Sequence, residues 1–184
     1  MHQSRDTRKR SAEGFTLVEV SLSIVVLMVG VLTITSSTLR IDALRRKNHD
    51  SALAHLAISQ VAETLQAHAA RARFEVDGDS VNTWSESFLN LAQGDYAEGF
   101  PVANFTPLPG AERAGSVQFI TNETLRDEDL EIVMGMPRDL NRDGDSLDTS
   151  VVEDAHLLAV IIRVAWSGQN GVEEQVHPLW VQGD

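Results

Sequence analysis

The sequence contains no cysteine, and it contains no proline before Pro101. The lack of cysteine excludes a disulfide scaffold, a zinc site with thiolate ligands and a cysteine nucleophile. Basic residues are scarce as well, because 15 lysine and arginine side chains stand against 27 acidic ones, which gives a formal net charge of -12. That balance argues against nucleic acid as a partner, since its phosphates attract a basic surface. The six histidines show no ligand-like spacing, so a metalloenzyme is not expected.

Charge is nearly absent from residues 15–39, where Glu19 is the single charged side chain. As a helix, this stretch would be about 37 Å long, enough to cross a bilayer core of about 30 Å. A buried core helix rarely runs so far without a polar stripe. A cleavable secretory signal usually has a shorter apolar stretch of about 7–15 residues, and residues 35–37 would make a poor cleavage site. A membrane-spanning helix is therefore the favoured interpretation.

The charges that flank this stretch do not orient it. Four basic residues precede it and four follow it closely, so the positive-inside rule favours neither direction. A carboxylate near the end of an apolar helix either reaches water at the interface or needs a cation as its partner. Cleavage of the chain after Gly14 would supply that cation, because Phe15 would then carry a free ammonium group four residues before Glu19.

These residues resemble a known processing site. A basic leader, Gly14, the sequence Phe-Thr-Leu-Val-Glu over residues 15–19 and a long apolar helix are together similar to the N-terminus of type IV pilins and type II secretion pseudopilins. The resemblance is strong over about residues 8–74 and is closest to minor subunits of the PilV or GspI type.

The resemblance implies a sequence of events for this chain. A prepilin peptidase would cleave between Gly14 and Phe15 and N-methylate Phe15. Glu19 would pair with the terminal amine of a neighbouring subunit during filament assembly. The leader would lie in the cytoplasm, and the head would lie outside the inner membrane. The expected partners are other pilins or pseudopilins, the peptidase and the inner-membrane assembly platform.

The apolar pattern changes after Arg40. Leu53, Ala57, Val61, Leu65 and Ala69 recur every fourth residue, with Leu56, Ile58 and Ala62 beside them. This spacing predicts an amphipathic continuation of the same helix, with one face packed on a sheet.

Beyond the helix, glycine and proline predict a loop-rich segment up to residue 115. A short helix is expected at 83–92, and strands are expected at 116–121, 131–135, 156–166 and 172–181. The last two strands flank a turn region at 167–171, and alternation along 160–166 predicts a half-buried antiparallel strand. The predicted fold is α+β and pilin-like, with a long N-terminal helix on a small antiparallel sheet. Its parts are a cleaved leader (1–14), the membrane and filament-core half of the helix (15–39), the amphipathic half (40–74) and a globular head (75–184).

Residues 120–154 hold eleven acidic and three basic side chains. At their centre, oxygen donors alternate along the chain and Gly144 follows them, as a calcium-binding loop requires. The predicted ligands are Asp139, Asn141, Asp143, Asp145 and Asp148. The register resembles the first half of an EF-hand loop or dockerin repeat, but Ser150 stands where the bidentate glutamate belongs, so Asp148, Glu153 or Asp154 would have to complete the site. The alternative is a solvated acidic turn without metal.

No catalytic motif is present, so we expect a structural protein rather than an enzyme. The favoured hypothesis is a minor pilin or pseudopilin that joins a type IV pilus or a type II secretion pseudopilus. The main alternative is a membrane-anchored calcium-binding or adhesive module that does not polymerise. A third, weaker hypothesis is a secreted hydrolase with a signal peptide.

Overall fold

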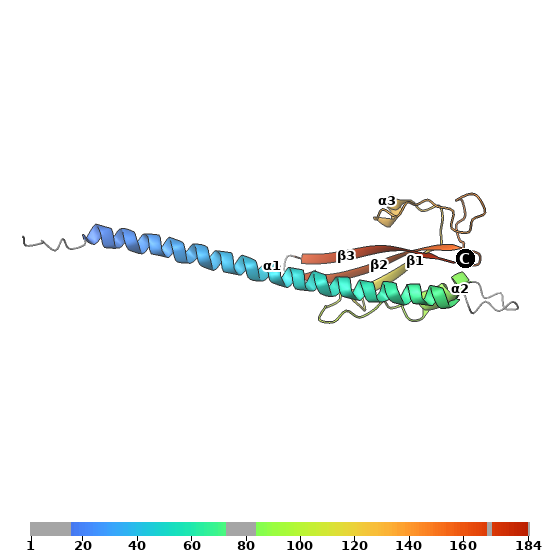
Figure 1. Cartoon of the computed structure of the whole chain (residues 1–184), viewed down its shortest axis with the longest axis horizontal. Coiled ribbons are helices and arrows are strands. Elements are labelled where there is room, and N and C mark those ends of the chain that lie inside the picture. Colours follow the sequence, from blue (N-terminus) through green and yellow to red (C-terminus); the bar gives the residue numbers. More distant parts are fainter. Residues whose placement is uncertain (1–15, 73–83, 169–170, 184) are drawn as a thin grey trace, which may run out of the picture. The chain divides into compact units, whose positions relative to one another are not determined.

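The computed structural model describes residues 16–72, 84–168 and 171–183. The elements follow in the order α1 (Leu17–Ala72), α2 (Trp84–Gln93), β1 (Gly115–Ile120), α3 (Asp127–Leu130), β2 (Leu157–Gly168) and β3 (Gly171–Gln182) (Figure 1). The chain divides into two compact units, Met1–Arg45 and Arg46–Asp184.

The first element confirms the predicted long helix. α1 is continuous over 56 residues, as expected for a segment without proline and with Gly30 as its single glycine. It begins after Thr16, whose Oγ1 accepts a hydrogen bond from the backbone N–H of Glu19 at 3.3 Å. A threonine in this position satisfies one of the backbone donors that every helix N-terminus leaves free.

In the second unit, α1 contributes one apolar face to the core. Ala54, Ile58, Val61, Leu65 and Ala69 are buried, at the spacing of three and four residues that places side chains on one helix face. Leu56, which was expected to widen this face, is 62% exposed instead. It lies two residues before Ile58, and at 100° per residue this points it away from the sheet.

The sheet has three antiparallel strands in the order β1-β2-β3. β2 is central: Gly115 of β1 pairs with its Val164, and Gly171 of β3 pairs with its Gly168. Alternate β2 side chains enter the core that also contains α1 and α2. These are Leu158, Val160, Ile162, Val164 and Trp166. The predicted helix at 83–92 is confirmed as α2, whose Trp84 and Phe88 are buried in the same core.

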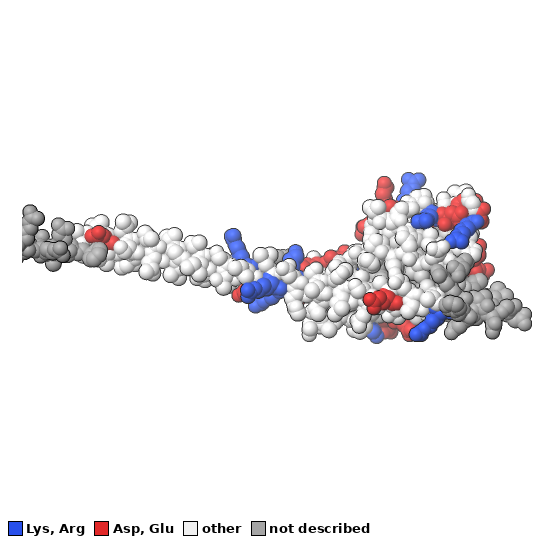
Figure 2. All heavy atoms as spheres, viewed as in Figure 1, with Lys and Arg blue, Asp and Glu red and all other residues white. Residues whose placement is uncertain are grey.

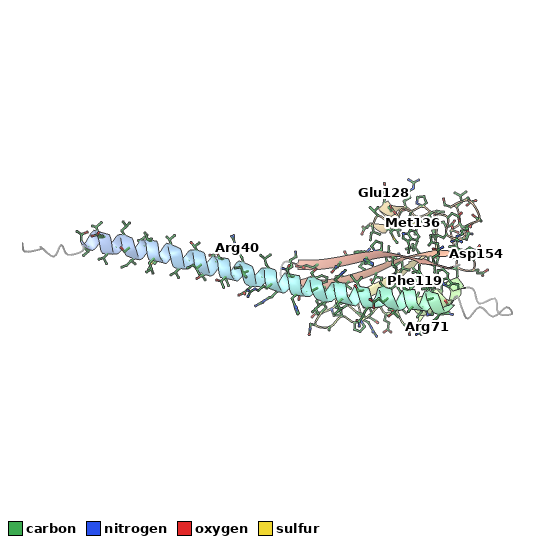
Figure 3. All side chains as sticks on the ribbon, viewed as in Figure 1. Arg40, Arg71, Phe119, Glu128, Met136 and Asp154 are labelled. Carbon is green, nitrogen blue, oxygen red and sulfur yellow. The ribbon has the colours of Figure 1, made fainter. Side chains whose placement is uncertain are left out.

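The other face of β2 is covered as well, which corrects the prediction of a half-buried strand. Ala159 and Ile161 are buried in a second cluster with Leu130, Met134 and Met136. Figure 1 shows α3 on the side of the sheet away from α1, and Figure 3 labels Met136 in the same outer layer. The outer layer shields Ala159 and Ile161 from water, which is consistent with their apolar side chains. The next residue on this face, Arg163, is polar and only half-buried.

The predicted strand at 131–135 is wrong. This segment forms turns and bends in the outer layer, and two of its residues have positive φ, 56° at Glu131 and 81° at Gly135. Its apolar residues, Ile132 and Met134, pack against the sheet from a loop. Alternation of apolar residues over so short a stretch does not distinguish a strand from a loop that packs on a sheet.

Candidate functional site

Within the described residues, one helix is long and apolar enough to cross a membrane, and it is α1. The most apolar part of the helix has none of its residues buried in the protein. Figure 2 shows that the N-terminal part of α1 is almost free of charged side chains, apart from one acidic residue near its start. A signal sequence near the N-terminus would share these properties of length and composition.

Most hydroxyl groups within the apolar half of α1 are satisfied by the helix itself. Each of six serine and threonine side chains donates a hydrogen bond to the carbonyl four residues earlier, at 2.8–3.0 Å. They are Ser21, Ser23, Thr33, Thr35, Ser37 and Thr38. Such bonds remove the cost of placing a free hydroxyl in hydrocarbon. These residues are therefore compatible with an apolar environment around the helix.

Glu19 is the charged residue in this otherwise uncharged part of α1. It lies in the first turn of α1, it is exposed, and its carboxylate has no hydrogen-bond or ion-pair partner among the described residues. Gly14 and Phe15, the residues of the predicted cleavage site, lie outside the described residues. An acidic residue in the first turn of a helix is favourable for the helix dipole, but that benefit does not require a partner from another molecule.

The acidic loop is ordered by its own side chains. Asp139 accepts the backbone N–H groups of Arg142 and of Gly144, the second at 3.0 Å. Asp143 and Asp145 then accept the N–H groups two residues further along, at 3.0 and 2.9 Å. Gly144 has a φ of 105°, a conformation that favours glycine. These bonds show that the alternating acidic residues order the backbone of their own loop.

Among the predicted metal ligands, the structure brings Asn141 and Asp148 together and adds Asp154 to them. The Asn141 side chain donates to Asp148 Oδ2 at 3.1 Å and to Asp154 Oδ2 at 3.2 Å. Asp139, Asp143 and Asp145 are engaged with the loop backbone instead. No three histidine or acidic side chains converge on one point within the described residues.

One residue near this loop was not predicted from the sequence. Glu123 is fully buried, and its Oε1 accepts the backbone N–H groups of Leu140 and Asn141. Its other oxygen, Oε2, is enclosed and has no hydrogen-bond partner among the described residues. No sequence signal marks it, because Thr121-Asn122-Glu123-Thr124 has the composition of an exposed turn.

A second carboxylate organises the outer layer. Asp127 accepts three backbone N–H groups, those of Met134 at 3.0 Å, Gly135 at 3.0 Å and Met136 at 2.8 Å. These hydrogen bonds, led by that from Met136, hold the pKa of Asp127 below its usual value, because they favour the charged form. The carboxylate thus fixes the loop that carries two buried methionines onto the sheet.

This arrangement predicts a pH-dependent contribution to stability. Since the folded pKa of Asp127 is lowered, its contribution is present above the unfolded value of 3.8 and is lost as the pH falls through the folded pKa. Asp127→Asn should therefore lower the melting temperature at pH 6, and the difference from the parent chain should close at pH values well below 3.8. The exposed neighbour Glu128 provides the control, because Glu128→Gln should leave the melting curve unchanged. A difference between Asp127→Asn and the parent that is the same at every pH would refute this role.

Comparisons with protein-family models, with curated proteins and with solved structures find no match to this chain. Its layout is pilin-like. A long N-terminal helix with an apolar, exposed first part is followed by a small antiparallel sheet, and the sheet packs on the later part of that helix.

Proposed function

We propose that this chain is a minor pilin or pseudopilin, a structural subunit without enzymatic activity. The leader would be removed after Gly14, and the chain would sit in the inner membrane through the first half of α1 with its head outside the cytoplasm. It would then join a type IV pilus or a type II secretion pseudopilus. The observation that supports this most strongly is the structure of α1. Its first part is apolar with no residue buried in the protein, and its second part packs on a sheet.

The properties of α1 suit a helix that first lies in the membrane and then packs against the helices of other subunits in a filament. Six of its hydroxyl groups donate to carbonyl oxygens of the same helix, so these groups can face hydrocarbon or a neighbouring subunit without an unpaired donor. Glu19 is the single charged group in that surface and lies in the first turn of α1, and it would pair with the terminal amine of Phe15 of a neighbouring subunit. The partners would be other pilins or pseudopilins, the prepilin peptidase and the assembly platform.

The state of the N-terminus tests this proposal. Mass analysis of the chain from a cell that has a prepilin peptidase should find a mature form that starts at N-methylated Phe15. In the same cells, replacing Gly14 by a bulky residue (Gly14→Leu) should leave the chain at its full length. An uncut parent chain would instead favour a membrane-anchored module that does not polymerise. A start after about residue 37 would indicate a cleaved secretory signal.

A further inference from the structure

Four basic residues follow the apolar half of α1 within about two helical turns. They are Arg40, Arg45, Arg46 and Lys47, and together they are called the basic belt below. All four side chains are exposed, and none of them forms an ion pair with another described residue. Figure 2 shows a group of basic side chains part-way along the helix. The positive charges of the basic belt are therefore free to bind a partner outside the chain.

The basic belt surrounds the helix and does not mark one face of it. At 100° per residue, Arg45 and Arg46 lie about 140° and 240° around the helix axis from Arg40. Lys47 returns to within about 20° of Arg40. The acidic residue among them, Asp42, leaves the belt with a net charge of +3. A protein that docks on one face of α1 would meet only part of this charge, whereas a layer of anionic groups around the helix would meet all of it.

The position of the basic belt along α1 matches the headgroup layer of a membrane. Twenty uncharged residues separate Glu19 from Arg40. As a helix they span about 30 Å, the thickness of the hydrocarbon core of a bilayer. The belt covers roughly 10 Å more along the helix axis, and the polar layer at each face of a bilayer is about 5–8 Å thick. Ile41 and Leu44 lie between the basic residues and are 49% and 60% exposed, as suits a helix at the boundary between headgroups and acyl chains.

The charge of the remaining chain gives the basic belt a role. After Lys47 the chain has 23 acidic and 7 basic side chains, so an anionic membrane surface repels the head. Under the proposed function, on which this inference rests, the belt lies on the outer side of the inner membrane, where the positive-inside rule disfavours basic residues. We propose that the basic belt binds the anionic headgroups of phospholipids around α1. This binding fixes the depth of α1 in the membrane and offsets the repulsion between the head and the membrane surface.

Native mass spectrometry of the full chain in detergent micelles tests the proposal. The micelles contain equal amounts of phosphatidylglycerol, which is anionic, and phosphatidylcholine, which has no net charge, and the mass of the chain gives the lipids that it retains. In every chain tested, glutamine replaces the four basic residues before Gly14, so that they do not add a second basic cluster. A chain with the belt intact should retain phosphatidylglycerol at least fivefold more often than phosphatidylcholine, since one basic residue near an anionic surface raises binding roughly fivefold. Glutamine at all four belt positions should reduce this preference to less than about twofold.

A matched control removes the same amount of charge elsewhere. In it, glutamine replaces four exposed arginines of the second unit, Arg71, Arg113, Arg126 and Arg142. This control should keep the preference for phosphatidylglycerol within about twofold of the chain with the belt intact, and circular dichroism verifies that every variant is folded. Equal retention of the two lipids by the chain with the belt intact would overturn the proposal. A preference that persists without the belt, or that the control loses as well, would also overturn it. None of these results would alter N-terminal processing after Gly14, which tests the proposed function separately.

Discussion

A chain that carries Glu19→Ala should be processed at Gly14 but should fail to enter filaments. In the proposed assembly, Glu19 pairs with the amine of a neighbouring Phe15 among apolar helices. Removing one partner of such a pair leaves the other charge buried and unpaired, at a cost of about 3–5 kcal/mol. That cost corresponds to a decrease of at least a hundredfold in the association constant. Filaments sheared from cells, compared with the membrane fraction, measure incorporation, and the mass of the membrane-bound chain measures cleavage.

Ser23→Ala is the matched control for this experiment. Ser23 lies one turn after Glu19 on the same face of α1, and its hydroxyl donates to the carbonyl oxygen of Glu19 at 2.8 Å within the helix. Its removal deletes a polar group from that face without unpairing a charge, so incorporation should be close to that of the parent. If Glu19→Ala subunits are incorporated normally, Glu19 does no more than reach water at the membrane surface or support the first turn of the helix.

The parts of the fold that were predicted correctly depend on local sequence patterns. The extent of α1 follows from an absence of proline and a long apolar run, and the buried residues Val61, Leu65 and Ala69 follow from helical spacing. The β2–β3 pair follows from two apolar runs separated by a short polar segment that contains two glycines, Gly168 and Gly171. In each case neighbours in sequence are also neighbours in the structure, so the pattern alone is informative.

The parts that were missed depend on contacts between distant residues. Glu123 looks like an exposed turn residue, but it is fully buried and accepts N–H groups from Leu140 and Asn141, which are distant in sequence. The strand at 160–166 was predicted to be half-buried because the sequence does not show that Leu130 and Met134 would cover Ile161. The acidic loop combines both situations. Its alternating donors were recognised, but the structure uses most of them to accept backbone N–H groups and brings Asp154 to Asn141 from outside the motif.

Phe88→Ala should be the most destabilising single substitution in the head. Phe88 is fully buried and joins three elements through its ring. It lies 5.1 Å from the ring of His68 on α1, 4.9 Å from that of Trp84 on α2 and 6.0 Å from that of Phe119 on β1, measured between ring centroids.

Truncation of this ring removes the contact that fixes α2 between α1 and β1, and it leaves a cavity that these elements can fill only in part. Such substitutions typically cost about 3–5 kcal/mol, a large fraction of the roughly 5–15 kcal/mol that stabilises a domain. Urea unfolding of the detergent-solubilised chain, followed by tryptophan fluorescence, measures the loss. Val133 is the control, because its side chain is 85% exposed in the outer layer. Val133→Ala should change the free energy of unfolding by no more than about 0.5 kcal/mol. If Phe88→Ala and Val133→Ala unfold at the same urea concentration, α2 is not held in the core by this ring, and the packing of the head on α1 must depend on the sheet residues alone.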